Sequence, residues 1–291
     1  MERITAYTPA YNVSEYLART IEGLISQTYP FDEIFVIDDG SRDNSAEIAS
    51  RYPQVKLIRH SVNKGLAAAR NTAMSVARNE LIASVDADVV ADANWIATLL
   101  PHMADPKVAG AGGILVEGVQ KTLADRWRGA HMAQEWGPNY IRNPRFIYGS
   151  NNVLRKSAVL EAGGYNESLR TCGEDPDLAS RLRGRGWDLV YDPAAVTTHM
   201  RHDNLRSVMD MYWRWWKNGN QAYPNGVSLR SWLGHALFVH FRYNFLEPAE
   251  VDFAKGRLDL LALDFLVLGY MPYRDFRLWV STKAVHAPPN S

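Results

Sequence analysis

Short apolar runs alternate with helix-like segments over the first 90 residues, and this alternation restricts the fold more than any other feature. The runs predicted to be strands are Arg3–Thr8, Ile34–Ile37, Val55–Arg59 and Leu81–Val85. The segments predicted to be helices are Glu15–Ser26, Asn44–Arg51 and Gly65–Ala77. Strands that alternate with helices of this length indicate an α/β fold with a doubly wound, mostly parallel sheet.

Polar clusters follow three of these strands at the point where each strand ends. The clusters are Thr8–Asn12, Asp38–Ser41 and Asp86–Asp88. Ligands of doubly wound sheets bind beyond the carboxyl ends of the strands. We therefore expect the three clusters to share one edge of the sheet and to form one site.

Asp86 and Asp88 are the most informative pair in the chain. Residues i and i+2 of an extended segment point to the same side, so both carboxylates can face one site. Close carboxylates repel each other unless a cation lies beside them, and oxygen-rich sites of this kind suit Mg²⁺ or Mn²⁺. The motif alone leaves a solvated acidic turn open as the alternative.

Composition narrows the class of protein. Lys plus Arg and Asp plus Glu number 32 each, so no overall field favours nucleic acid or an anionic membrane. The single cysteine excludes an intrachain disulfide and fits a reducing compartment. The first strand begins almost at Met1, and no apolar run approaches the ~20 residues of a spanning helix. We expect a cytoplasmic protein whose membrane contact is at most peripheral, on the inner face of the cytoplasmic membrane.

Seven motifs in order resemble family 2 glycosyltransferases of the GT-A fold. They are Pro9–Asn12, Ile37–Ser41, Asn63–Asn71, Asp86–Asp88, Gly149–Asn152, Gly163–Glu167 and Gly173–Leu178. The resemblance covers roughly the first 200 residues. It implies an inverting enzyme that uses a nucleotide-sugar and Mn²⁺ or Mg²⁺ to glycosylate a hydroxyl of a carbohydrate, lipid-linked or other acceptor. It divides the chain into a catalytic domain, residues 1–205, with halves at 1–90 and 91–205, and a helical extension, residues 206–291.

The resemblance also assigns the donor side of the site. The residues expected to bind the nucleotide-sugar are Thr8, Pro9, Tyr11, Asp39, Lys64, Arg70 and Asp86. Asp39 would contact the pyrimidine ring, and because a carboxylate accepts from the N3–H of uracil, a UDP-sugar is favoured. Asp88 and His199 would be metal ligands, with Asp86 on the ribose or in the water shell of the metal.

Glu174 and Asp175 form a second carboxylate pair, ahead of a helix predicted over Asp177–Arg185. Acids are ordinary near a helix start, which is the structural alternative. In the family motif the Asp is usually the base that takes the proton of the acceptor hydroxyl. Asp175 is therefore the candidate base, with Glu174 in reserve. Asn151 and Asn152 are placed to hydrogen-bond a sugar.

The chain after Arg206 is rich in aromatic residues. Processive family members carry Gln-x-x-Arg-Trp, and Met211–Trp215 has Met in place of Gln, which favours a single-addition enzyme. We expect the helix at Met209–Trp216 to pack on the catalytic domain, with an interfacial anchor as the alternative. Helices predicted at Ser228–Tyr243 and Lys255–Tyr270 could pack locally, contact a membrane or form a homo-oligomer.

Two other functions compete with this interpretation. A nucleotidyltransferase shares the sheet and the acidic metal site, but it normally has a glycine-rich, basic loop after the first strand. Residues 8–15 contain no Gly, Lys or Arg. A catalytically silent sugar-binding or assembly protein would have no need to keep Asp88 and Asp175 together.

Overall fold

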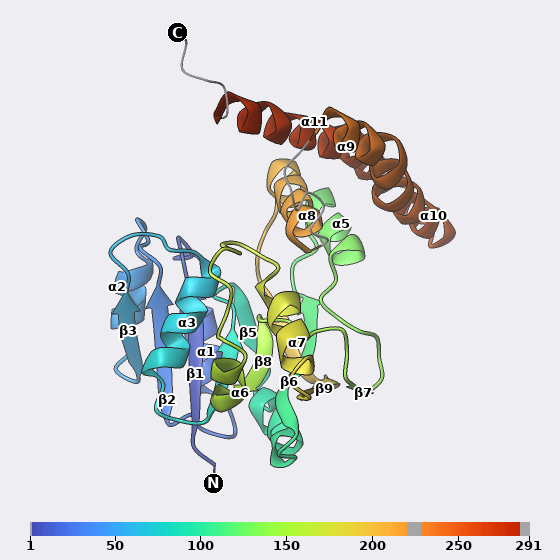
Figure 1. Ribbon diagram of the computed structural model, residues 1–291. Coiled ribbons are helices and arrows are strands. Elements are labelled where there is room, and N and C mark those ends of the chain that lie inside the picture. Colours follow the sequence, from blue (N-terminus) through green and yellow to red (C-terminus); the bar gives the residue numbers. More distant parts are fainter. Residues whose placement is uncertain (1, 220–227, 286–291) are drawn as a thin grey trace. The chain divides into compact units, whose positions relative to one another are not determined.

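The computed structural model describes residues 2–219 and 228–285, and the chain forms two compact units (Figure 1). The α/β unit comprises Met1–Val119 and Ala133–Arg201. The helical unit comprises Gln120–Met132 and His202–Ser291. The division expected at residue 205 did not assign residues 120–132 to the helical part. They join it through contacts that are distant in sequence, such as the 2.6 Å bond between Arg128 Nη1 and Asp203 Oδ2.

One nine-stranded sheet forms the centre of the α/β unit, in the order β3-β2-β1-β4-β8-β6-β9-β5, with β7 paired to β9. The strands are β1 Ile4–Ala10, β2 Glu33–Asp38, β3 Val55–Arg59, β4 Leu81–Val85, β5 Val89–Ala91, β6 Val108–Glu117, β7 Ile141–Arg142, β8 Asn151–Arg155 and β9 Asp188–His199. The first four positions are parallel, and β8 runs antiparallel to both β4 and β6. The predicted doubly wound, largely parallel sheet is confirmed.

Helices cover both faces of this sheet. They are α1 Leu17–Ile25, α2 Ser45–Ser50, α3 Leu66–Val76, α4 Trp95–Leu99, η1 Leu100–Ala104, α6 Lys156–Glu161 and α7 Glu174–Arg183. In β4, Ile82 packs in the core with Met74 of α3, whereas Ala83 packs in the opposite core with Trp95 of α4. Successive strand residues point to opposite faces, so strands covered on both sides are buried without interruption.

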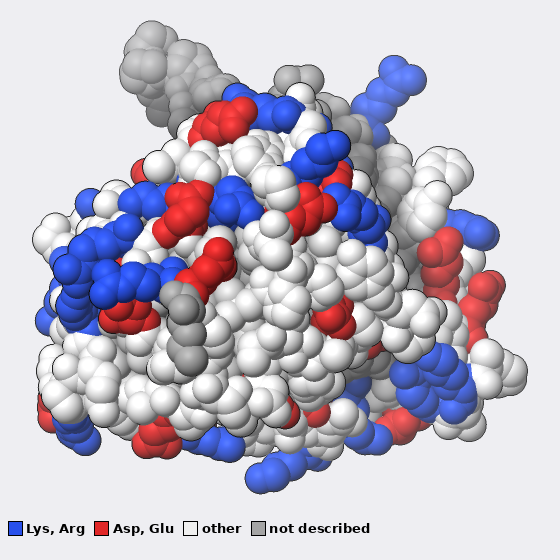
Figure 2. Space-filling model, turned by 90° about the horizontal axis from the view of Figure 1, so that it is seen from below, with Lys and Arg blue, Asp and Glu red and all other residues white. Residues whose placement is uncertain are grey.

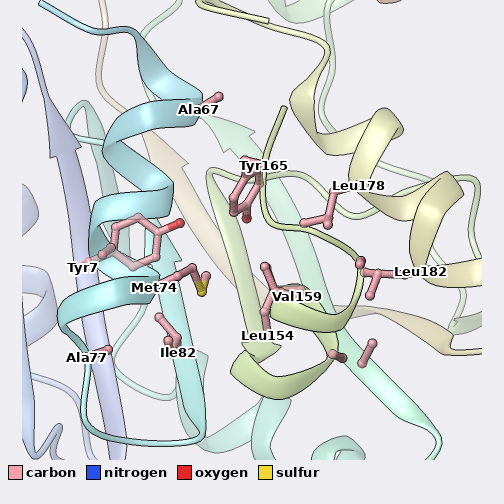
Figure 3. Packing of buried hydrophobic residues seen from close by; sticks show 14 of the residues in the cluster. Tyr7, Ala67, Met74, Ala77, Ile82, Leu154, Val159, Tyr165, Leu178 and Leu182 are labelled. Atoms are coloured by element: carbon pink, nitrogen blue, oxygen red, sulfur yellow. The ribbon is translucent and has the colours of Figure 1, made fainter. Parts of the chain in front are cut away.

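The core between the sheet, α3 and α7 holds the candidate site in place (Figure 3). Figure 3 shows Tyr7 and Met74 beside α3, with Leu178 and Leu182 of α7 pointing toward the same interior as Tyr165. Both helices begin at polar motifs that the sequence singled out. The packing therefore fixes where the first turns of α3 and α7 lie.

The described part of the helical unit consists mainly of helices. They are α5 Leu123–His131, α8 Leu205–Gly219, α9 Leu229–Gly234, the π-helical segments η2 His235–His240 and η3 Arg242–Leu246, α10 Glu247–Ala254 and α11 Leu261–Val285. The helix predicted at Lys255–Tyr270 begins later and runs further. Gly256 has a φ of 69°, and this left-handed turn separates α10 from α11.

The tryptophan-rich helix α8 packs inside the helical unit. Trp213 is buried in a core with Trp127 and Val267, and its Nε1 donates to Asp275 Oδ1 at 2.8 Å. The guanidinium of Arg274 lies 4.4 Å from the centre of the Trp213 ring. Trp213 is therefore a core residue, and an exposed anchor at this position was the wrong alternative.

The surface has no single-sign field on the face seen in Figure 2, where positive and negative side chains are interspersed. This agrees with equal totals of basic and acidic residues. None of the helices within residues 2–219 and 228–285 is long and apolar enough to cross a membrane.

Candidate active site

Arg70, on α3, connects two pairs of carboxylates. Its Nη2 donates to Asp86 Oδ1 at 3.0 Å, and its Nε lies 3.4 Å from Glu174 Oε1. Its Nη1 also donates to Ser84 Oγ at 2.7 Å and to the Gly149 carbonyl at 3.0 Å. Arg70 is only 1% exposed, and a buried guanidinium is tolerated only where such partners surround it. The sequence-predicted residues Arg70, Asp86 and Glu174 therefore lie together.

The Glu174–Asp175 pair occupies the first turn of α7. Gly173 precedes it with a φ of 91°, so the helix begins three residues earlier than expected. Pro176 is accommodated because the N–H groups of a first helical turn have no intrahelical partner. Asp175 Oδ2 accepts from the Gly149 N–H at 2.8 Å. A Cβ on Gly149 would lie 2.7 Å from Asp175 Oδ1 and overlap the Arg70 guanidinium, so only glycine fits there.

Burial sets the protonation of this pair. It raises the pKa of Glu174 to about 8, the neighbouring charge of Asp175 adds to the rise, and Arg70 opposes it. Burial likewise raises the pKa of Asp175, against Arg70 and the Gly149 N–H. Glu174 is 2% exposed, whereas Asp175 is only half-buried and so remains open to a second reactant. Asp175 is thus the more accessible carboxylate of the pair.

Asp88 and His199 form the second part of the site. The short antiparallel pairing of β5 with β9 brings them together, and His199 Nε2 lies 3.4 Å from Asp88 Oδ2. His199 Nδ1 lies 3.1 Å from Glu117 Oε2, at the end of β6. Burial lowers the pKa of His199, but hydrogen bonds to Asp88 and Glu117 outweigh it and raise the pKa to about 9. Burial also raises the pKa of Asp88, yet the bond from His199 holds that pKa below its ordinary value.

This arrangement fits a divalent cation. Asp88 supplies a carboxylate oxygen and His199 an imidazole nitrogen, both of which Mn²⁺ accepts. Metal-binding histidines usually donate their other N–H to a carboxylate, which fixes the tautomer, and Glu117 stands in that position. Glu117 was not predicted from the sequence as a site residue. The signal was the apolar run of β6 ending in an acid, the same pattern that marked Asp86 and Asp88 after β4.

Asp86 directly follows β4, and its side chain is 31% exposed. Burial raises its pKa, Arg70 lowers it, and the charge of Asp88 raises it again. Its Oδ1 accepts from Arg70, which leaves Oδ2 as the oxygen available to a ligand.

The residues expected around the nucleoside lie at the ends of β1 and β2. The Asp39 N–H donates to the Ala10 carbonyl at 2.8 Å, which places Tyr11 and Asp39 on one edge of the sheet. Tyr11 is 44% exposed, so its ring is open to a ligand, whereas Thr8 and Pro9 are buried in β1. The Thr8 hydroxyl has no hydrogen-bond partner within the described part of the chain.

Asp39 has a structural task that the sequence did not predict. Its Oδ1 accepts from the Lys64 N–H and its Oδ2 from the Gly65 N–H, each at 2.8 Å. His60 Nδ1 lies 2.7 Å from Oδ1. Asp39 thus fixes the turn that starts α3, and the exposed Lys64 takes part through its backbone.

The expectation that Asn151 binds a sugar is wrong. Asn151 is fully buried, and its Oδ1 accepts from Trp95 Nε1 at 2.6 Å. Its Nδ2 donates to the Ile114 carbonyl at 2.8 Å and to Thr197 Oγ1 at 3.0 Å. The side chain joins β8 to neighbouring strands, and no polar atom is left for a ligand.

Known proteins share this organisation. The sequence model for "Glycosyl transferase family 2" matches residues 5–163, more than half of the chain. The chain belongs to this family. The match includes the site residues from Thr8 to Asp88, while Glu174, Asp175 and His199 lie beyond it.

The chain is 28% identical over 211 residues to a pre-mycofactocin glycosyltransferase of Mycobacterium tuberculosis, covering 70% of this chain and 44% of that protein. It is 24% identical over 233 residues to a poly-beta-1,6-N-acetyl-D-glucosamine synthase of Staphylococcus aureus, covering 76% and 56%. The chain thus spans about half the length of these relatives. Its fold matches that of the mannosyltransferase PcManGT of Pyrobaculum calidifontis, solved with GDP-Man and Mn²⁺ (TM-score 0.63, 17% identity, 94% of this chain and 87% of that one).

Proposed function

We propose that this chain is a metal-dependent, inverting glycosyltransferase that moves a sugar from a nucleotide-sugar to a hydroxyl of a carbohydrate or lipid-linked acceptor. The observation that carries the proposal is the convergence of Asp86, Glu174 and Asp175 around the buried Arg70. A silent binding protein would have no need to bury a cation among three acids. Family membership supports the reaction class, and the site residues supply its chemistry.

Asp88 and His199 would hold Mn²⁺ or Mg²⁺, with Glu117 orienting the imidazole. The bound ion would supply positive charge to the departing diphosphate. Tyr11 would stack on the base, and Asp39 with Thr8 would line the nucleoside pocket.

Asp175 would act as the general base. As the acceptor oxygen attacks the anomeric carbon, the bond from that carbon to the diphosphate breaks, and the hydroxyl proton passes to Asp175. One displacement from the opposite face inverts the anomeric configuration and requires no covalent intermediate. The Gly149 N–H and Arg70 hold this region in place, and Arg70 keeps Glu174 beside the base.

Product identity tests this proposal directly. The protein is incubated with Mn²⁺ and, in turn, UDP-sugars and GDP-sugars, and release of the nucleoside diphosphate is followed. A UDP-sugar is our first choice of donor, while the GDP-Man bound to PcManGT makes the guanine series the necessary comparison. Release of pyrophosphate from nucleoside triphosphates would instead identify a nucleotidyltransferase. Donor binding without turnover under all conditions would favour the silent protein.

Other predictions concern the whole protein. We propose that residues 1–205 carry catalysis, because every candidate site residue lies there. A cytoplasmic location, single addition of sugar and a homo-oligomeric state also stay predictions. Sedimentation of the purified chain measures the last of these.

A further inference from the structure

The helical unit exposes an unusual number of large apolar side chains. Eleven of the 21 exposed large hydrophobic residues among those described lie on two segments, residues 229–246 and 261–281. They are Leu229, Leu233, Leu237, Phe238, Phe241, Tyr243, Phe265, Leu266, Tyr273, Phe276 and Val280. We call this set the apolar face. Monomeric soluble proteins rarely leave such a concentration of apolar residues in water, so the face indicates an interaction.

The two segments pack side by side, so the apolar face is continuous. The rings of Phe245 and Phe265 lie 4.8 Å apart, and Phe241 lies 5.8 Å from Phe245. Further along α11, Trp232 lies 5.5 Å from Phe276. Figure 1 shows α9 running alongside α11, in agreement with these contacts.

Exposed basic side chains outnumber acidic ones around the apolar face. Residues 228–246 contain no acidic residue, and Arg230 and Arg242 are exposed there. In residues 261–281 both acids, Asp264 and Asp275, are buried, while Arg277 is exposed. The nearest described exposed acids lie on α10 and the turn after it, where Glu247 is 3.6 Å from Arg242. The face thus complements an anionic surface.

The helical unit buries several paired polar groups beside its apolar core. His240 Nε2 lies 2.6 Å from Asp275 Oδ2, and both are buried. Asp264 is buried and accepts from Trp127 Nε1 at 2.8 Å, and Asp252 is buried beside His131 at 3.0 Å. Polar groups paired inside and apolar groups outside are the distribution expected of helices that contact lipid.

We propose that the apolar face docks in the plane of an anionic lipid surface. The helix α11 is too interrupted to cross a bilayer, since Asp264, Pro272 and Asp275 divide its apolar sequence. A second copy of the chain is a poorer occupant, because an isologous interface would place two faces with exposed Arg230 and Arg277 against each other. The docking surface is separate from the chemistry of the candidate active site.

The test is vesicle co-sedimentation of the full chain. Vesicles of phosphatidylcholine mixed with phosphatidylglycerol should bind the protein, and phosphatidylcholine alone should bind it less. The double variant Phe238→Ser/Phe265→Ser should weaken binding by about tenfold or more, because both rings are highly exposed, at 72% and 62%. The matched control Val62→Ser/Leu160→Ser removes apolar side chains that are 63% and 54% exposed in the α/β unit and should bind as wild type. The control should melt as wild type does, and the double variant should stay folded although Phe265→Ser removes the ring contact with Phe245.

A charge variant tests the choice of anionic lipid. Arg242→Gln/Arg277→Gln should weaken binding to the mixed vesicles by about tenfold or more, and added salt should reduce the difference between wild type and variant. Failure of the wild-type chain to bind either vesicle would overturn the proposal. Sedimentation of a dimer that Phe238→Ser/Phe265→Ser turns into monomers, without vesicle binding, would overturn it too and assign the face to a second copy. Vesicle binding by Asp175→Asn should be unchanged, so this proposal and the proposed activity fail separately.

Discussion

Replacement of Glu117 tests the candidate metal site most sharply. Its carboxylate lies 3.1 Å from His199 Nδ1, and it would act on the proposed ion through that ring. Glu117→Gln keeps the shape of the side chain and an oxygen that can accept the Nδ1 proton, and it removes the charge. Glu117→Ala removes both. The pair of variants therefore separates the electrostatic contribution from the orientation of the imidazole.

The magnitude follows from the protonation of His199. Hydrogen bonds to Asp88 and Glu117 raise its pKa from 6.5 to about 9 in spite of burial. One pKa unit corresponds to ~1.4 kcal/mol. If Asp88 and Glu117 contribute equally to the rise in pKa, the interaction of Glu117 with protonated His199 is worth about 1–2 kcal/mol. At a pH above about 9, where no proton competes for His199, we expect Glu117→Gln to weaken Mn²⁺ binding by about tenfold and Glu117→Ala by up to about a hundredfold, the range found for carboxylates that orient metal-binding histidines. At lower pH the fall in the pKa of His199 should offset part of this loss.

The pH dependence has a definite sign. The ion and the proton compete for His199 Nε2, so apparent Mn²⁺ affinity should rise with pH up to about 9, where His199 loses its proton. Without Glu117 the pKa of His199 falls, and the affinity should level off at a lower pH.

Calorimetric titration of Mn²⁺ in the presence of UDP or GDP measures these effects. Glu47→Gln, which removes a surface carboxylate paired with Arg51, is the matched control and should bind as wild type. Asp88→Asn should abolish metal-dependent nucleotide binding. If both Glu117 variants keep wild-type affinity while Asp88→Asn loses it, the reasoning about Glu117 is refuted.

Three further predictions concern the base and the core. Asp175→Asn should lower the transfer rate by ~10²–10⁴-fold with UDP affinity nearly unchanged, and retained transfer alongside loss in Glu174→Gln would move the base to Glu174. The pair titrates as a unit, and because only its ionised form accepts a proton, kcat/KM should rise with pH along a limb well above an ordinary carboxyl pKa. Glu174→Gln removes a like charge and should shift that limb to lower pH, and an unmoved limb would contradict the coupling. Trp213→Ala should destabilise the helical unit by ~3–5 kcal/mol, because it empties a core position and removes the hydrogen bond from Trp213 Nε1 to Asp275 Oδ1, and an unchanged thermal melt would count against this.

Local patterns predicted the first half of the fold well. The strands at Val55–Arg59 and Leu81–Val85 coincide with β3 and β4, since a short apolar run bounded by turn residues has few alternatives. The start of α7 was missed, because the left-handed turn at Gly173 is a backbone property that residue types only permit.

The parts of the site that were missed are non-local. Glu117 and His199 are 82 residues apart, and only the register of β6 with β9 shows that they are opposite each other. The structural use of Asn151 likewise depends on partners on β6 and β9. The alternative of a solvated acidic turn at Asp86–Asp88 was set aside by family resemblance, and the burial of Arg70 now gives the physical reason for that choice.

The position of Arg70 has a consequence for the order of events. A single guanidinium lies between the strand-end acid Asp86 and the helical acid Glu174, so its field is common to both. A ligand that alters the charge at Asp86 therefore changes how strongly Arg70 stabilises the ionised form of Glu174. By thermodynamic linkage, a change in the ionisation of Glu174 alters the affinity for that ligand by the same factor. If the proposed roles hold, donor binding at Asp86 and the basicity of the Glu174–Asp175 pair would be linked through Arg70. A lysine would keep the charge and lose the forked reach that makes this linkage.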